Sequence, residues 1–124
     1  MSMLALRFDL PEKSSNDVLA FAEKFLACGA VVNIESRPGI IVYAILKDGE
    51  EQGVLHCLES KLDQGERLML EHAIANWDQL FNFYLESIGD EGTDKNSKEA
   101  RIAAETVAYE HLTGAMANPE NVVA

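Results

Sequence analysis

The run of seven apolar residues from Ile40 to Leu46 constrains the fold of this chain most. Its side chains do not alternate with polar ones, so a strand formed here would be covered on both of its faces. Such a strand needs other strands beside it and further layers packed against it. The run therefore predicts the centre of a small sheet in a fold that also contains helices.

Two other segments have the pattern of strands. Met3–Leu10 alternates loosely between apolar and polar residues and is followed by Pro11, which ends it. Val31–Glu35 is rich in β-branched residues and is joined to Ile40–Leu46 by residues 36–39, which contain a Pro-Gly pair suited to a turn. We expect these last two segments to form a hairpin.

A helix is predicted between the first two strands. Ser14, Ser15 and Asn16 offer side-chain oxygens for an N-cap, and apolar residues then recur at helical spacing as far as Leu26. Gly29 supplies a stop signal. The first part of the chain therefore has the order β-α-β-β.

The remainder of the chain is predicted to be mainly helical. Residues 48–51 have the D-x-x-E form of a capping box, which favours a helix over 53–59, although a strand over the same residues stays open. After Gly65, which breaks or bends the chain, a wide apolar stripe from Met69 to Ile88 predicts a long helix. Asn96 with Glu99 can cap a last helix.

The last helix is expected to run from about Lys98 to Thr113, with Gly114 after it. The predicted fold class is therefore α+β, with a small antiparallel-containing sheet of about three strands (β-α-β-β) followed by two or three helices. We expect residues 1–114 to form a single domain and residues 115–124 to form a flexible C-terminal tail.

The two cysteines favour a reducing environment. Cys28 and Cys57 lie 29 positions apart and belong to no CxxC motif or multi-cysteine framework, so we expect reduced thiols with a packing role. The first residues do not have the pattern of a signal peptide, and no apolar run is long enough to span a membrane. We therefore expect a soluble, cytoplasmic protein.

Nearly all of the formal net charge of −11 lies between Asp48 and Asp94. This stretch holds twelve acidic residues and only two basic ones, Lys61 and Arg67, which gives it a charge of −10. Such a field repels nucleic-acid phosphates and anionic lipid headgroups and speeds the encounter with a basic protein surface. Direct binding of nucleic acid or membrane is therefore not expected. The alternative is that the acids only keep the protein in solution.

The long predicted helix also carries an unusual number of aromatic residues. Trp77, Phe81 and Tyr84 lie on its apolar stripe, and Phe83 lies off that stripe. Either this helix is covered on two sides in the core, or an aromatic edge is exposed where a partner or a second copy can bind.

No catalytic, metal or cofactor motif stands out. The three histidines, His56, His72 and His111, form none of the spacings that place two metal ligands on one side of a helix. The glycines are scattered and form no phosphate-binding loop. We therefore expect no metal, no cofactor and no enzymatic activity.

These observations favour a non-catalytic, acidic protein-binding protein that covers a basic surface of a partner, such as a nuclease or another nucleic-acid-binding protein. Immunity proteins of nuclease toxins and phage-encoded inhibitors act in this way as a class. Carboxylates would pair with the partner's lysine and arginine side chains, and an aromatic residue would anchor the contact. The expected partner-binding residues are Glu59, Glu66, Glu71, Asp78, Glu86, Asp90, Glu91, Trp77, Phe81 and Tyr84.

Two other classes of function stay open. One is a small enzyme or ligand-binding domain with a pocket between the sheet and the helices, for which Arg7, His72 and Tyr43 are the candidate groups. The other is a homodimeric structural module that uses the aromatic stripe as a two-fold interface. The identity of the partner is not specified by the sequence.

Overall fold

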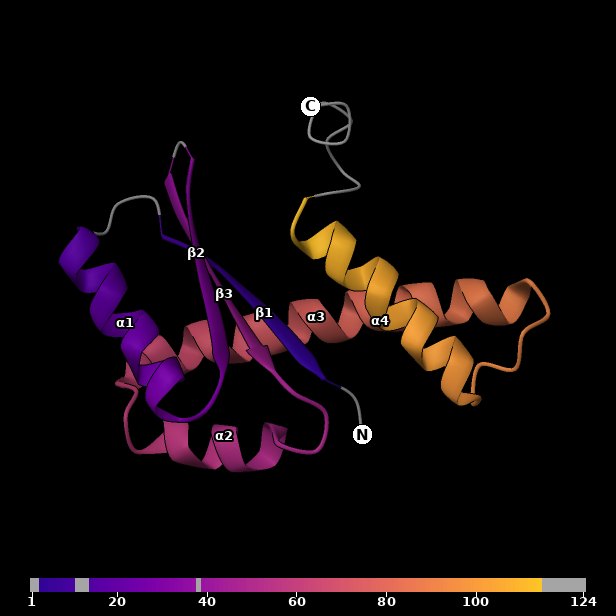
Figure 1. Ribbon diagram of the computed structural model, residues 1–124, viewed down its shortest axis with the longest axis horizontal. Helices are drawn as coiled ribbons and strands as arrows, with labels where there is room; N and C mark the ends of the chain where they lie inside the picture. Colours follow the sequence, from indigo (N-terminus) through magenta and orange to yellow (C-terminus); the bar gives the residue numbers. More distant parts are fainter. Residues whose placement is uncertain (1–2, 11–13, 38, 115–124) are drawn as a thin grey trace. The chain divides into compact units, whose positions relative to one another are not determined.

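The computed structural model describes residues 3–10, 14–37 and 39–114 (Figure 1). These residues form a three-stranded antiparallel sheet and four helices, which confirms the predicted α+β class. The tail predicted over 115–124 lies outside the described residues. The elements in chain order are β1 (Leu4–Asp9), α1 (Ser15–Ala27), β2 (Val31–Arg37), β3 (Gly39–Leu46), α2 (Glu51–Glu59), α3 (Gln64–Asp90) and α4 (Lys98–Leu112).

The chain divides into two compact units, Met1–Ile74 and Ala75–Ala124. The first unit contains the sheet, α1, α2 and the first turns of α3, and the second contains the rest of α3 and α4. The interpretation of residues 1–114 as a single domain stays a prediction.

Strand β3 is the central strand of the sheet, whose order is β1-β3-β2. It pairs antiparallel with both neighbours, with Tyr43 opposite Arg7 of β1 and Val42 opposite Ile34 of β2. The consecutive residues Val42, Tyr43 and Ala44 are all buried. Because successive side chains of a strand point to opposite faces, β3 is covered on both faces, as its apolar run predicted.

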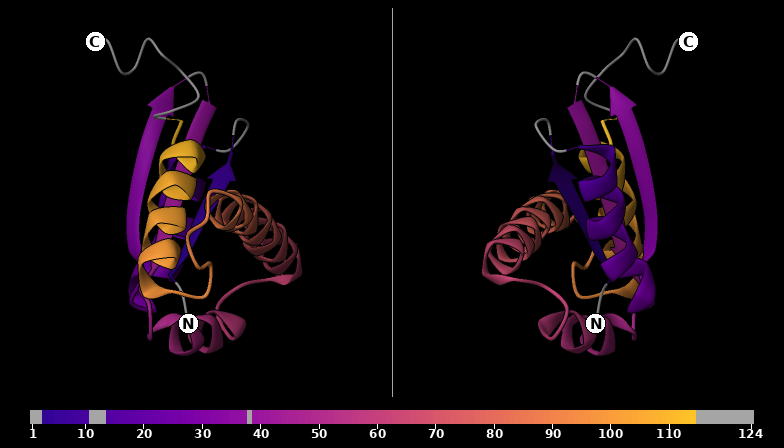
Figure 2. Two further views of the ribbon diagram at one scale, coloured as in Figure 1. Left: turned by 90° about the vertical axis from the view of Figure 1, so that its right-hand side faces the viewer. Right: turned by 90° about the vertical axis from the view of Figure 1, so that its left-hand side faces the viewer.

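Helix α1 contacts β2 and β3 and covers one face of the sheet (Figure 2). Its Phe21 and Phe25 pack with Phe8 of β1, with ring centroids 5.0 to 5.3 Å apart. Such tilted and edge-to-face aromatic contacts add to the stabilisation that comes from burying apolar area. All three phenylalanines belong to the buried core of the first unit.

The ends of α1 follow the predicted signals. The Ser14 hydroxyl oxygen accepts a hydrogen bond from the backbone N–H of Asp17 at 3.2 Å, which caps the N-terminus of the helix. Gly29 follows the helix with a φ of 98°, a conformation that only glycine adopts without strain. The predicted helix is confirmed.

Residues 51–59 form a helix, α2, which settles the alternative left open between helix and strand. Val54 and Leu58 of this helix are buried in the core of the first unit. The expected capping box, however, is wrong, because α2 begins after Glu50 and no side chain caps it. Gly49 has a φ of 87°, which places Asp48 in a turn that precedes the helix.

The capping box of this region lies instead at the start of α3. The Asp63 carboxylate accepts a hydrogen bond from the backbone N–H of Glu66 at 2.8 Å, and the Glu66 carboxylate accepts one from the N–H of Asp63 at 3.0 Å. This reciprocal pair satisfies two donors that the first helical turn leaves free. Helix α3 therefore begins before Gly65, and the break between α2 and α3 falls at residues 60–63.

In the second unit, a hydrogen bond joins α3 to α4. The Tyr84 hydroxyl lies 3.0 Å from Nδ1 of His111. Helix α4 is capped by Ser97, whose hydroxyl oxygen accepts from the N–H of Ala100 at 3.2 Å, so the cap predicted at Asn96 is wrong by one residue. One side of α4 is buried, at residues spaced four apart: Ala100, Ala104, Ala108 and Leu112.

Candidate functional site

A groove of about 580 Å³ lies between α2 and the first turns of α3. It belongs wholly to the first unit. Its floor is apolar, because Leu58 and Leu62 are buried and the half-buried Leu55 and Leu70 also contribute. Its polar lining residues are Glu59, Arg67 and Glu71. The groove therefore combines a leucine floor with two of the predicted partner-binding carboxylates.

The charged side chains of this groove differ in how they are held. A terminal nitrogen of the Arg67 guanidinium donates a hydrogen bond to the backbone carbonyl of Glu59 at 2.7 Å. The exposed Glu59 carboxylate lies 3.7 Å from Nδ1 of His56. Glu71 is exposed and makes no ion pair with any residue that the structure describes. Glu71 is therefore the carboxylate of the groove that is most available to a cation from outside.

Glu66 lies in a different environment from the other predicted carboxylates. Its side chain is 18% exposed and accepts a hydrogen bond from Nζ of Lys24, on α1, at 2.7 Å. The same carboxylate oxygen also accepts from the N–H of Asp63. Glu66 thus joins α1 to α3 and caps α3, so these two contacts within the first unit occupy it.

The predicted carboxylates of the second unit are exposed. Asp78 lies on α3, Glu86 and Asp90 lie in the last turns of that helix, and Glu91 follows it. Nζ of Lys95 donates a hydrogen bond to Glu86 at 2.8 Å. This hydrogen bond, together with the negative charges of Glu86 and Asp90, raises the pKa of Lys95. Asp78 and Glu91 hold no cation within the described part of the chain.

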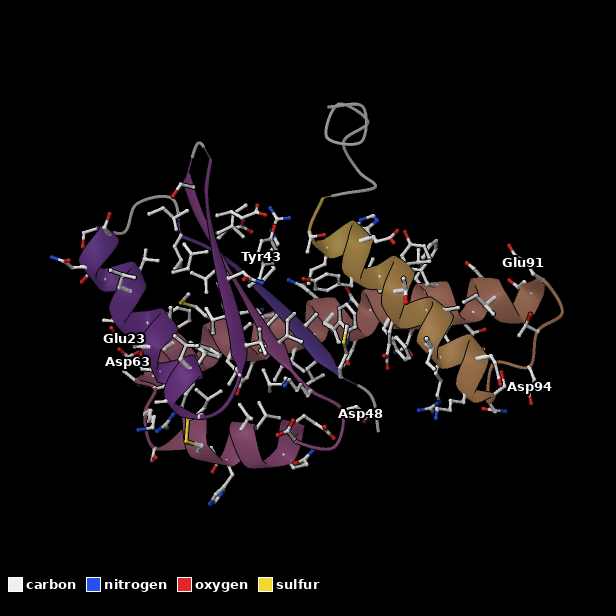
Figure 3. The ribbon with its side chains drawn as sticks, in the orientation of Figure 1. Glu23, Tyr43, Asp48, Asp63, Glu91 and Asp94 are labelled. Atoms are coloured by element: carbon white, nitrogen blue, oxygen red, sulfur yellow. A yellow bond between two sulfur atoms is a disulfide. The ribbon has the colours of Figure 1, made fainter. Side chains whose placement is uncertain are left out.

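The connection between α3 and α4 is rich in carboxylates. Glu91 and Asp94 extend from this connection, where Figure 3 labels them. A hollow of about 320 Å³ is lined here by Glu86, Asp90, Asp94 and Lys95 with neighbouring polar residues. Among the residues that the structure describes, no group of three or more histidine, cysteine or carboxylate side chains has the arrangement of a metal site. Two of these carboxylates have partners within the connection, because Glu86 accepts from Lys95 and Asp94 accepts from the backbone N–H of Asn96 at 3.0 Å.

The predicted aromatic anchors differ in exposure. Trp77 is 1% exposed and stacks on the buried Phe81 with ring centroids 6.3 Å apart. Tyr84 is half-buried and is held by His111. Phe83, in contrast, is 63% exposed and packs edge-on against Tyr84. Phe83 and the exposed part of Tyr84 can therefore contact a partner directly, whereas Trp77 and Phe81 are buried in the second unit.

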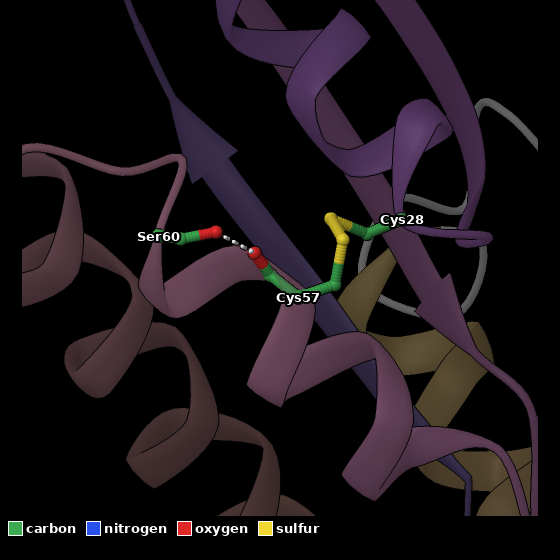
Figure 4. Close-up of a disulfide and its surroundings, with 3 residues drawn as sticks. All are labelled: Cys28, Cys57 and Ser60. Carbon is green, nitrogen blue, oxygen red and sulfur yellow. Dashed lines mark hydrogen bonds between the residues drawn. A yellow bond between two sulfur atoms is a disulfide. The ribbon is translucent and has the colours of Figure 1, made fainter.

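The cysteines form a disulfide, so the expectation of reduced thiols is wrong. Cys28, just after the end of α1, is bonded to Cys57 of α2, with Cα atoms 5.6 Å apart (Figure 4). The backbone carbonyl of Cys57 also accepts a hydrogen bond from the Ser60 hydroxyl at 3.1 Å. Because α2 also forms one wall of the groove, this bond fixes that wall to α1.

Sequence reasoning missed one unusual carboxylate. Glu51, the first residue of α2, is 4% exposed, and neither of its carboxylate oxygens has a hydrogen-bond partner among the described residues. A buried polar group without a partner costs free energy, so such groups are uncommon. The signal that could have found Glu51 is its spacing of three and seven residues from Val54 and Leu58, which places all three on the buried side of α2.

The groups proposed for an enzyme or ligand site are not brought together as a set. Arg7 lies over the ring of the buried Tyr43, with its guanidinium carbon 6.0 Å from the ring centroid. His72 is exposed on α3. A separate hollow of about 300 Å³ between α1 and α3 is lined by Lys24 and Glu66 among others and contains none of these three groups.

Comparison with known proteins does not assign a family or a fold relative to this chain. No protein-family model, curated protein or solved structure matches the chain. No helix in the described ranges combines the length and the apolar character needed to cross a bilayer.

Proposed function

We propose that this chain is a non-catalytic, acidic protein-binding protein that covers a basic, nucleic-acid-handling surface of a partner, in the manner of an inhibitor or immunity protein. The observation that carries the proposal is the presence of exposed carboxylates that hold no cation in the described part of the chain. Among the predicted partner-binding residues, these carboxylates are Glu71 in the first unit and Asp78 and Glu91 in the second.

The proposed mechanism is occlusion. A surface that handles nucleic acid holds phosphates with lysine and arginine side chains. Carboxylates that pair with those side chains remove the phosphate-binding groups from use, and charge-assisted hydrogen bonds of this kind are stronger than neutral ones. The net charge of −11 also accelerates the encounter at low ionic strength. The exposed Phe83 supplies an aromatic group that can be buried in the contact.

The test changes only exposed carboxylates that hold no cation among the described residues. Glu66 is left intact, because its contacts with Lys24 and Asp63 stabilise the fold. The test variant carries Glu71→Lys, Asp78→Lys and Glu91→Lys. A matched control carries Glu23→Lys, Glu99→Lys and Glu110→Lys, which are also exposed. Both variants change the formal net charge from −11 to −5.

The experiment is affinity capture from the native host by each variant, at low and at high salt, with identification of captured proteins by mass spectrometry. We expect a basic protein that is retained by the unmodified chain and by the control, is lost from the test variant, and elutes at high salt. Capture that is equal with the test variant, or that is insensitive to salt, contradicts the proposal.

A small ligand-binding or enzymatic domain is the second candidate function. The hollow between α1 and α3 favours it, since Lys24 and Glu66 place a cation and a carboxylate beside apolar residues such as Phe21 and Met69. A homodimeric module is a third candidate, for which the exposed Phe83 would lie in the interface. Gel filtration of the unmodified chain and of Phe83→Ser distinguishes a dimer from a monomer.

The cytoplasm, expected from the sequence, stays a proposed location. The Cys28–Cys57 bond favours an oxidising compartment instead. Alkylation of the protein in native cells, followed by mass spectrometry of the two cysteine-containing peptides, decides between these locations. Alkylated thiols support the cytoplasm, and a bonded pair contradicts it.

A further inference from the structure

We infer that the groove between α2 and α3 receives a helical segment of the partner that carries leucine-like side chains next to lysine or arginine. This inference rests on the proposed function and deepens it, because it assigns the partner's chemistry to one place in the first unit. The groove is lined by Leu55, Leu58, Glu59, Leu62, Arg67, Leu70 and Glu71.

The leucine side chains at the floor of the groove favour a ligand with apolar side chains. Leu58 and Leu62 are buried, and Leu55 and Leu70 are partly buried and line the opening. A volume of about 580 Å³ is within the range of sites that take several side chains or a small ligand. An apolar floor between two helices suits the apolar face of a third helix, whose anchors recur every three or four residues.

The charged side chains beside the floor favour a ligand that also carries basic side chains. Glu59 and Glu71 place two carboxylates at the groove, whereas the one basic lining residue, Arg67, is held by the Glu59 backbone carbonyl. Glu71 has no cation of its own among the described residues. An incoming lysine or arginine therefore finds a carboxylate without a cation beside an apolar floor, whereas an incoming carboxylate meets two carboxylates and only one guanidinium.

The two walls of the groove, α2 and the start of α3, are both fixed to α1. The Cys28–Cys57 bond holds α2 to the end of α1, and the Lys24–Glu66 pair holds the start of α3 to the same helix. Both walls are thus attached to α1 before a ligand arrives. A groove that is formed in advance loses less conformational entropy on binding than one that must be assembled.

The test uses the full chain and a synthetic peptide of about four helical turns, with leucine at i, i+3, i+4 and i+7 and lysine at the remaining positions. A first matched peptide has glutamate in place of every lysine, and a second has serine in place of every leucine. Binding is followed by the NMR signals of the leucine methyl groups, at peptide concentrations up to about 1 mM.

We expect the leucine-lysine peptide to shift the methyl signals of Leu55 and Leu70, and both matched peptides to bind at least about tenfold more weakly. Glu71→Lys should lower the affinity for the leucine-lysine peptide by a similar factor. Glu110→Lys, an exposed change outside the groove, should leave it unchanged. Leu55→Ser, which alters the floor, should also weaken binding, and Glu71→Lys keeps the test valid if that variant does not fold.

Absence of binding, equal binding of the glutamate peptide, or an affinity unaffected by Glu71→Lys overturns the inference. A peptide that binds but shifts only signals of the second unit also overturns it. That last outcome leaves the proposed function in place, because the carboxylates of the second unit then bind the basic ligand. Failure of the capture experiment, in contrast, overturns the proposed function without reference to the groove.

Discussion

The two units use their charged and polar residues in different ways. In the first unit, a disulfide, the Lys24–Glu66 pair and the Asp63–Glu66 cap connect one element to another. In the second, the Lys95–Glu86 pair and the Tyr84–His111 hydrogen bond also join segments, but Asp90, Glu91 and Asp94 are exposed around the connection between α3 and α4. A high density of acids in the sequence therefore does not tell which carboxylates hold the fold together and which are available to a partner.

The largest effect on stability is expected from loss of the disulfide. The Cys28–Cys57 bond closes a loop over a sequence separation of 29, and the unfolded chain gains conformational freedom when the bond is removed. We expect the double variant Cys28→Ser, Cys57→Ser to lose about 3 kcal/mol in the free energy of unfolding, measured by urea denaturation.

Reduction of the unmodified chain should produce a similar loss, and the same reductant should leave the double variant unchanged. If the reduced and oxidised chains unfold at the same urea concentration, the disulfide contributes nothing to the first unit. The contrast between the two units would then rest on the polar contacts alone.

The second effect is expected from Glu66. Glu66→Lys removes an N-terminal cap and places a second positive charge beside Lys24, so we expect a loss of about 2 kcal/mol in the free energy of unfolding. Glu66→Gln, whose side-chain carbonyl can still accept from Asp63, should lose less than Glu66→Lys. Glu91→Lys, an exposed change in the second unit, should stay within about 0.5 kcal/mol of the unmodified chain.

Urea denaturation of these three variants side by side compares the two units directly. Equal stability of the Glu66→Lys and Glu91→Lys variants would show that Glu66 is as free to bind a partner as Glu91. The distinction drawn between the two regions would then be wrong.

The smallest effect is expected at Lys95. Its pKa is raised above the ordinary value of 10.5, mainly by the hydrogen bond to Glu86 and also by the charges of Glu86 and Asp90. Because the folded pKa is raised, the stabilisation from this pair is present below pH 10.5 and is lost as the pH rises through the folded pKa. Glu86→Gln should lower the Lys95 pKa, measured by NMR titration of the side chain. If the pKa of Lys95 is the same in Glu86→Gln, the hydrogen bond between Lys95 and Glu86 is contradicted.

The main elements of the fold could be predicted because their signals are local. The apolar run Ile40–Leu46 indicated the central strand, and Ser14 and Gly29 marked the two ends of α1. The D-x-x-E pattern, however, occurs at Asp48 and again at Asp63, and only the second forms a capping box. The turn at Gly49 separates Asp48 from α2, and this turn depends on a backbone conformation that the motif does not specify.

The candidate site was harder to predict because its determinants are distant in sequence. Glu66 accepts a hydrogen bond from Lys24, which lies 42 positions away in the sequence. Cys57 is bonded to Cys28 because α2 packs against the end of α1. Neither partner follows from spacing along the chain. Charge patterning therefore identified a set of acidic residues, but tertiary contacts decide which of them can reach a partner.

The disulfide has a practical consequence for proteolysis. The covalent ring that it closes contains β2, β3 and most of α2. A protease that cuts once inside this ring opens the backbone but leaves both pieces attached to each other. Such a nicked molecule migrates as one band on a gel without reductant and separates into two fragments only after the sulfur bridge is broken.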